Sequence, residues 1–175
     1  SPSFLADLAR PRPDPGGGSA TAYAALVALA LGEKVTRLEL GRCRPEQTHR
    51  RFWDEHLHGI MQLKQDFSRL CHRDVLAYQQ VARALSGTAE RDQRQAAVEE
   101  AIECPRQVMA TVRLALATAQ ALGTQCRQHL VGDVLVAVEL LGAVLLGAHH
   151  IAVANVPWLE ESQQQAAMLE GLHKE

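Results

Sequence analysis

One apolar stripe, spaced as on a helix, constrains the fold of this chain more than any other feature. Between residues 53 and 85 the stripe advances in alternating steps of four and three, and eight of its ten positions are apolar, aromatic or cysteine. A stripe with that period is the contact face of a long helix packed against other helices. Its positions are Trp53, Leu57, Ile60, Lys64, Phe67, Cys71, Asp74, Tyr78, Val81 and Leu85. We therefore expect one helix from near Pro45 to Leu85, with Lys64 and Asp74 as charged exceptions on its packed face.

The rest of the chain carries the same helical signal. Aromatic residues make up only 4% of it, while alanine, leucine and valine are abundant, and this balance favours helices over strands. A chain of 175 residues without a solenoid repeat fits one domain over residues 1–175. Pro105 is expected to kink a helix or to start a new one. The predicted fold is all-α, a bundle of about five long helices plus short terminal helices. The further helices are expected over residues 3–9, 20–40, 91–103, 106–122, 130–153 and 159–172.

A turn rich in proline and glycine, PDPGGGS, leads into the helix expected from residue 20. Gly16, Gly17 and Gly18 allow positive φ and leave backbone N–H groups uncovered, and Ser19 is a candidate N-cap. At a helix N-terminus such donors face an anion or a developing negative charge, although a tight turn without a ligand gives the same pattern. No GK[ST] follows and no strand precedes, which excludes a nucleotide-triphosphate loop.

Charged residues within apolar segments are the candidates for chemistry. Asp133 lies near the start of the apolar segment 130–153, where it either complements the helix dipole or acts, partly desolvated, as an acid or base. Asp74 and Lys64 are ten residues apart, about 15 Å along a helix axis, so they cannot pair with each other. Each needs a partner from another helix or subunit, and such charges can also serve only to fix helix register.

Charge argues against nucleic acids and membranes as partners. The formal net charge is −2, and the basic cluster that includes Arg42 and Arg44 is interpreted as a solvated helix face. Segment 130–153 is apolar enough to span a membrane, but Asp133 and Glu139 within it favour a buried core helix.

Neither the histidines nor the cysteines predict a metal site. His149 and His150 are adjacent and therefore point apart on a helix, with no further ligand at helical spacing. The four cysteines form no CxxC pair, which favours free thiols in a reducing compartment. No secretory signal is visible at the start of the sequence, so we expect a cytoplasmic protein.

Several short motifs, in this order and at matching spacing, resemble one family. They are Phe4-Leu5 before PDPGGGS, LELGR at residues 38–42, Asp74 with Ala77-Tyr78, Glu103-Cys104-Pro105, Gly132-Asp133 and Asn155. The last four fall where the family carries D-x-x-A-F/Y, E-x-P, S-D-A-G and the second Asn of N-V-R-I-N. Over residues 3–159 the chain resembles the C-terminal domain of formiminotransferase-cyclodeaminase and the related free-standing methenyltetrahydrofolate cyclohydrolases.

The resemblance implies an all-α dimer that binds folate in a cleft near the dimer interface, with a formiminotransferase as a possible partner. Members close 5-formiminotetrahydrofolate to the 5,10-methenyl compound with loss of ammonia, or hydrolyse the methenyl compound to 10-formyltetrahydrofolate, without a metal or redox cofactor. The resemblance also makes Asp133 and Asp74 the candidates for the general acid, the general base and the group that orients the substrate. The turn would offer N–H groups to the ligand, and basic residues would meet the folate glutamate carboxylates. The implied ligand-binding set is Gly16, Gly17, Gly18, Ser19, Arg42, Arg44 and Lys64.

The chain also departs from the family pattern. Gly132 and Leu135 replace the serine and glycine of S-D-A-G, and Ile151 to Val153 replace N-V-R. These changes keep an alternative open: a catalytically inactive helical dimer that binds a ligand or organises a larger enzyme. The sequence also leaves open which folate reaction is catalysed, and whether Asp74 and Asp133 meet in one subunit or across two.

Overall fold

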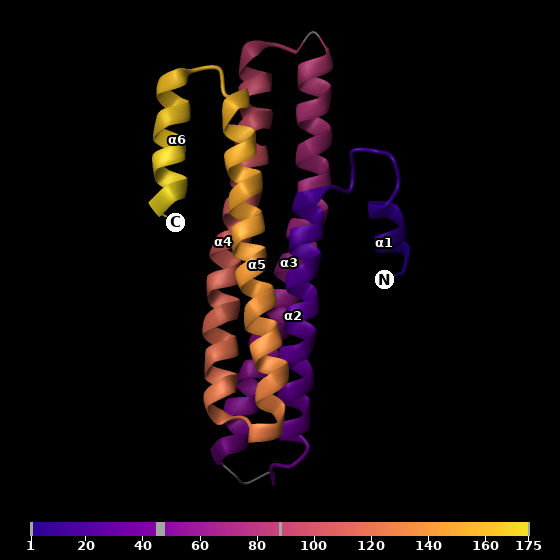
Figure 1. The fold of residues 1–175 in the computed structure, drawn as a ribbon, viewed down its shortest axis with the longest axis vertical. Coiled ribbons are helices and arrows are strands. Elements are labelled where there is room, and N and C mark those ends of the chain that lie inside the picture. The colour runs from indigo at the N-terminus through magenta and orange to yellow at the C-terminus, as the bar shows by residue number, and fades with distance from the viewer. Residues whose placement is uncertain (1, 45–47, 88, 175) are drawn as a thin grey trace.

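Four long antiparallel helices form the body of the protein, as Figure 1 shows for the computed structural model. The structure describes residues 2–44, 48–87 and 89–174, and within these ranges it contains helices and no strand. The helices are α1 (Pro2–Leu8), α2 (Gly17–Leu40), α3 (Thr48–Ser86), α4 (Arg91–Gln125), α5 (Val131–Asn155) and α6 (Ser162–Lys174), with 3₁₀ turns η1 (Gln128–Leu130) and η2 (Val156–Trp158).

The all-α prediction is confirmed, and the long stripe forms α3 as expected. The two segments expected on either side of Pro105 are one continuous helix, α4, so the bundle has four long helices in the described ranges. Pro105 lacks a backbone N–H, but it is buried in the bundle, where packing holds the helix together across it. The expected helix start at Pro45 lies outside the described residues.

Helix order around the bundle follows the chain. α2 packs beside α3 and α5, and α4 packs beside the same two helices, so α3 lies diagonally across from α5. Apolar side chains from the α3 stripe fill the centre: Trp53, Ile60 and Phe67 have no exposed surface. Burying such side chains is the main stabilising contribution to a bundle of this kind.

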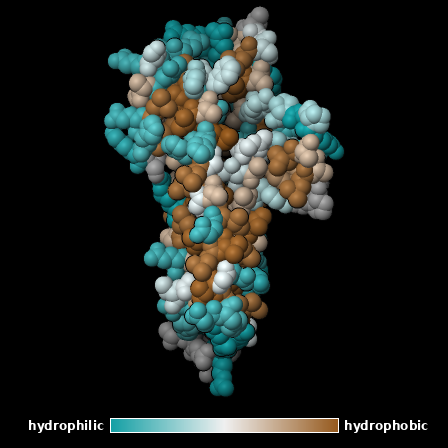
Figure 2. All heavy atoms as spheres, viewed as in Figure 1, coloured by the Kyte–Doolittle hydropathy of each residue, from teal (hydrophilic) through white to brown (hydrophobic). Residues whose placement is uncertain are grey.

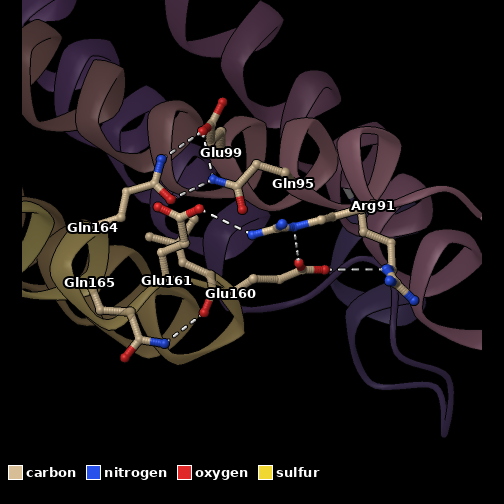
Figure 3. A network of polar contacts seen from close by, with 9 residues as sticks. Arg91, Gln95, Glu99, Glu160, Glu161, Gln164 and Gln165 are labelled. Atoms are coloured by element: carbon tan, nitrogen blue, oxygen red, sulfur yellow. Dashed lines mark hydrogen bonds and ion pairs between the residues drawn. The ribbon is translucent and has the colours of Figure 1, made fainter.

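A smaller second core lies at one end of the bundle, where α6 folds back beside α4 and α5 (Figure 1). Leu159 and Leu172 are buried there against Ile102 of α4 and Val156 of η2. Figure 3 shows the polar network that ties this end together. Arg91 of α4 pairs with Glu160 at 2.7 Å and with Glu161 at 3.1 Å. The network therefore fixes the turn that follows η2.

α5 carries apolar side chains on its outward face as well as on the face that packs in the core. Leu141 and Val144 are buried, whereas Leu135, Val136 and Leu146 are each more than half exposed. Brown apolar surface accordingly runs along the middle of the molecule in Figure 2. By length and composition the Gln128–Trp158 segment, alone among the described residues, could cross a membrane, and 28% of its most apolar window is buried. The expected core helix is thus buried on its inner face only.

Candidate functional site

A cavity of about 400 Å³ opens at the end of the bundle where α2 begins and α5 ends. Its wall combines the glycine turn, the second half of α3 and the last turn of α5 with η2. Pockets of this size accept a small organic ligand. The residues used below are Gly16, Gly17, Gly18, Asp74, Tyr78, Ile151, Asn155 and Trp158, all of which line it.

The three glycines of the turn allow close approach between helices. Gly16 is the N-cap of α2, so the interpretation of Ser19 as the N-cap is wrong, and no described glycine adopts the positive φ that glycine allows. A Cβ on Gly18 would lie 1.9 Å from Oδ1 of Asp74, and one on Gly17 would lie 3.1 Å from Cδ1 of Ile151. Glycine is required because α3 and α5 press against the first turn of α2.

Asp74 is the carboxylate at the base of this cavity. Ser19 donates its hydroxyl to Oδ2 of Asp74 at 2.7 Å, and the Ser19 backbone N–H also donates to the carboxylate. Asp74, which lies on the neighbouring helix α3, thus accepts a hydrogen bond from a free backbone N–H in the first turn of α2, as a capping side chain does. Burial raises the pKa of Asp74 above its ordinary value, and the two hydrogen bonds from Ser19 oppose that rise. A carboxyl group with a raised pKa is suited to exchange protons near neutral pH.

Two thiols lie close enough to Asp74 to feel its charge: Cys104, which is buried, and Cys71, which is partly buried. Burial, followed by the negative charge of Asp74, raises the pKa of Cys71 and raises the pKa of Cys104 to about 12. Cys71 contacts the backbone carbonyl of Ser19 at 3.5 Å, so it helps to hold the start of α2 in place. Thiols with raised pKa values stay protonated, and these two therefore serve as packing groups.

Polar tethers hold the cavity wall from both sides. Gln79 of α3 donates to Oδ2 of Asp14 at 2.7 Å, which anchors the proline turn to the helix. Asn155 donates to the backbone carbonyl of Ala101 at 2.8 Å. The Asp14–Gln79 pair was not predicted, because its members are 65 residues apart and Gln79 belongs to no recognisable motif.

The remaining wall is apolar and aromatic. Tyr78 is 43% exposed and Trp158 is 55% exposed, and both side chains lie on the cavity wall. Ile151 lies opposite Gly17 at the point where the resemblance places an asparagine. Exposed aromatic faces beside a partly buried carboxylate suit a flat heteroaromatic ligand. Trp158 was not predicted as a site residue, because it lies between the helices expected over residues 130–153 and 159–172 and belongs to no motif.

Asp133 does not share this cavity within one chain. Oδ2 of Asp133 accepts from Nζ of Lys34 at 2.8 Å, near the opposite end of α2. Ile151, which lines the cavity, is eighteen residues further along α5, or about 27 Å away along the axis. Of the two arrangements that the sequence left open, the two aspartates therefore do not meet within a single subunit, because α5 carries Asp133 at the end of the helix away from the cavity.

The basic residues expected to bind the ligand also lie away from the cavity. Lys64 donates to Glu33 at 2.6 Å, and this hydrogen bond is the first cause of a lowered pKa for Glu33. Arg42 is 3.7 Å from Glu39, and Arg44 follows it beyond the end of α2. That end is about 36 Å from Gly17 along a helix of 24 residues. None of these three basic residues lines the cavity.

No metal-binding cluster was found within residues 2–44, 48–87 and 89–174, where no three His, Cys, Asp or Glu side chains gather. The cavity wall instead carries the carboxylates of Asp14 and Asp74, the polar side chains of Tyr78 and Asn155, and the glycines at the start of α2. A reaction that proceeds by proton transfer without a metal remains a prediction, and the groups on the cavity wall are compatible with it.

Comparison with known proteins relates the chain to one family and to solved structures of similar fold. The family model described as formiminotransferase-cyclodeaminase matches residues 2–174. The solved structure of formiminotetrahydrofolate cyclodeaminase from Thermotoga maritima is similar in fold, with a TM-score of 0.86 and 21% sequence identity; the match covers 98% of this chain and 85% of that one. A search of curated proteins found no match.

Proposed function

The chain belongs to the formiminotransferase-cyclodeaminase family, and from that premise we propose that it is a folate one-carbon enzyme. Its substrate is 5,10-methenyltetrahydrofolate, which it hydrolyses, or 5-formiminotetrahydrofolate, which it cyclises with release of ammonia. The observation that carries the proposal is Asp74, a carboxylate with a raised pKa that Ser19 holds at the base of a 400 Å³ cavity.

Both reactions pass through a tetrahedral carbon between two nitrogens, and both need a group that accepts and returns a proton. In the hydrolysis, water adds to the methenyl carbon and Asp74 accepts one of its protons. Asp74 then gives that proton to N5 as the C–N5 bond breaks. The second water proton leaves to solvent as the formyl C=O forms. One carboxyl group can perform both transfers when its pKa lies close to the working pH.

The cyclisation uses the same carboxylate. N10 attacks the protonated formimino carbon, and Asp74 accepts the N10 proton as the new C–N bond forms. The same proton passes to the amino group, which leaves as ammonia while the methenyl cation forms. Ser19 orients the carboxylate for these transfers through its hydrogen bond of 2.7 Å.

We assign binding of the folate substrate to the apolar wall of the cavity and to the start of α2. Tyr78 and Trp158 offer exposed aromatic faces for stacking with the pterin ring. Gly17 and Gly18 form the first turn of α2, where backbone N–H groups have no partner within the helix and favour nearby negative charge. The catalytic site proposed within one chain thus consists of Asp74, Ser19 and this turn.

A turnover assay tests the proposal. The purified chain is mixed with 5,10-methenyltetrahydrofolate, and the loss of near-ultraviolet absorbance is followed above the buffer rate. We expect acceleration by the wild-type chain and a loss of about 10²–10⁴-fold in Asp74→Asn, the range for removing a general acid or base. Glu55→Gln is the matched control, because Glu55 is an exposed carboxylate on the same helix, paired only with Arg51 one turn away. Equal rates for Asp74→Asn and wild type would refute the role of Asp74.

The second candidate is a non-catalytic dimer that binds a ligand or organises a larger enzyme. The observation that favours it is Ile151, which makes the wall opposite Gly17 apolar. Calorimetric heat on adding a folate, together with no turnover of either substrate, would support this candidate. Measured turnover would dismiss it.

A homodimer and a cytoplasmic location complete the proposal. The exposed outer face of α5 supports association, since large exposed apolar patches mark interaction sites. All four cysteines are free, which fits a reducing compartment. Light scattering of the purified chain gives its mass in solution, and a monomer at micromolar concentration would contradict the dimer.

A further inference from the structure

Asp14 is a second carboxylate on the wall of the cavity, and the proposed reaction makes no use of it. The side-chain amide of Gln79 donates to Oδ2 of Asp14 at 2.7 Å. Asp14 lines the cavity and Gln79 does not, so the amide holds the carboxylate from outside the cavity. The two oxygens of a carboxylate offer about four lone-pair positions, so one hydrogen bond leaves most of its accepting capacity available.

No positive charge neutralises Asp14 within the part of the chain that the structure describes. Arg10 and Arg12, the basic residues nearest in sequence, pair with Asp7 at 3.1 Å and 3.4 Å. The hydrogen-bond partner of Asp14 is a neutral amide, and no described Lys, Arg or His lines the cavity. A partly buried carboxylate without a cation is unfavourable unless further donors reach it. We therefore expect those donors to come from the ligand.

The carboxylate of Asp14 is held in place before any ligand binds. Pro13 and Pro15 flank it, and proline fixes its own φ and restricts the backbone of the residue before it. Gln79 restrains the side chain as well. A group held in this way loses little conformational entropy on binding and so contributes to selectivity. Anchoring the turn needs only an acceptor for Gln79, which a neutral asparagine also provides, so the negative charge goes beyond what anchoring requires.

Asp14 and Asp74 lie at two levels of the same cavity. Gln79, which holds Asp14, is five residues beyond Asp74 on α3, or about 7.5 Å along the helix axis. Tyr78 lies between these levels and, like Trp158, offers an exposed aromatic face to the cavity. The separation is comparable with the long dimension of a fused two-ring heterocycle. Such a ring system can therefore stack on the aromatic wall while its two ends reach the two carboxylates.

We propose that Asp14 is a specificity-determining residue of the cavity, where its carboxylate accepts hydrogen bonds from the adjacent amide N–H and amino group of a pterin ring. Asp74 then faces the reactive carbon at the other end of the ligand. The identity of the ligand rests on the proposed function. Two N–H donors side by side match the two oxygens of a carboxylate, as the donors of a guanidinium group do. A ring without the amino group leaves part of Asp14 unpaired, so the cavity selects against it.

Calorimetric binding of two probes tests the role of Asp14. The probes are 5-formyltetrahydrofolate, which lacks the reactive methenyl carbon, and its 2-desamino-2-methyl derivative, which lacks the amino donor. We expect the wild-type chain to bind the amino compound about 10–100-fold more tightly, the range for one hydrogen bond to a charged group. Asp14→Asn should lose this preference, because its oxygen stays bonded to Gln79 and its NH₂ group then meets the donors of the ligand.

Asp7→Asn is the matched control, because Asp7 is a partly buried carboxylate of the same N-terminal segment that does not line the cavity; its preference should equal that of the wild type. Equal binding of the two probes by the wild type overturns the role of Asp14, and that comparison needs no variant to fold. An equal loss for both probes in Asp14→Asn also overturns it, because a residue that only anchors the turn would give that result.

Two further outcomes separate this inference from the proposed function. Guanosine carries the same adjacent amide and amino donors, and tighter binding of guanosine than of 5-formyltetrahydrofolate overturns the assignment to a pterin. Absence of binding for both folate probes overturns the inference as well. In each case, turnover of 5,10-methenyltetrahydrofolate by the wild-type chain decides the proposed function separately, since that assay depends on Asp74 and compares no ring substituents.

Discussion

Gly18→Ala is the substitution for which the structure gives the sharpest expectation. The added Cβ would lie 1.9 Å from Oδ1 and 2.5 Å from Cγ of Asp74, far inside any real contact. The Asp74 side chain must rotate away, since α2 and α3 are both held by the core. That movement breaks the 2.7 Å hydrogen bond from Ser19 and leaves a buried carboxylate with fewer donors.

The size of the effect follows from the lost contacts. A hydrogen bond to a charged group contributes about 1.5–3 kcal/mol, and alanine in place of glycine in a helix returns at most about 1 kcal/mol. We expect a net loss of roughly 1–3 kcal/mol in the free energy of unfolding. For a domain of this length each kcal/mol shifts Tm by about 2–4 °C, so Tm should fall by about 2–12 °C.

Thermal unfolding followed by circular dichroism measures this fall, and two further variants isolate its cause. Gly59→Ala is the matched control, because its added Cβ meets no atom within 4 Å on exposed α3; its Tm should rise slightly. Removing the obstructing carboxylate with Asp74→Ala should make Gly18→Ala nearly neutral in that background. If Gly18→Ala leaves Tm unchanged, or costs as much without the carboxylate as with it, the steric reasoning is wrong.

Three more variants or treatments probe the charges of the site. Burial raises the pKa of Asp74, so the folded chain binds the carboxyl proton more tightly than the unfolded chain does. Protonation of Asp74 therefore stabilises the fold below pH 3.8, and this stabilisation is lost as the pH rises through the pKa of the folded state. The difference in Tm between Asp74→Asn and wild type should therefore become more positive from pH 4 to pH 8; a constant difference would contradict the raised pKa. Cys104, with a pKa of about 12, should resist iodoacetamide at pH 8 until the chain unfolds, and mass spectrometry of native samples modified at Cys104 would disprove this. Asp133→Asn removes an exposed pair with Lys34 and should change stability by less than about 1 kcal/mol, as measured by urea unfolding; a larger loss would mean that Asp133 has a structural role within the chain.

The helices and the cavity turn were accessible from the sequence because both depend on local spacing. The ten positions of the α3 stripe define one helix face over about nine turns, and PDPGGGS marks the start of α2. Asp74 could be singled out because it places a charge on a packed helix face, and a charge in such a place needs a hydrogen-bonding or charged partner. The exception is Pro105, which was predicted to kink a helix or to start a new one; the second alternative is wrong, because α4 continues through the buried proline.

What local spacing cannot determine is which ends of two helices meet. Asp133 and Asp74 both qualified as buried or half-buried carboxylates, but only the antiparallel course of α2 and α5 decides that Asp133 meets Lys34 while Ile151 meets Gly17. The role of Gly18 likewise depends on a carboxylate 56 residues away. By itself the sequence determined which side chains share a helix face, because that follows from a period of 3.6 residues. Only the tertiary structure decided which faces and ends come together, because that depends on the packing of all four helices at once.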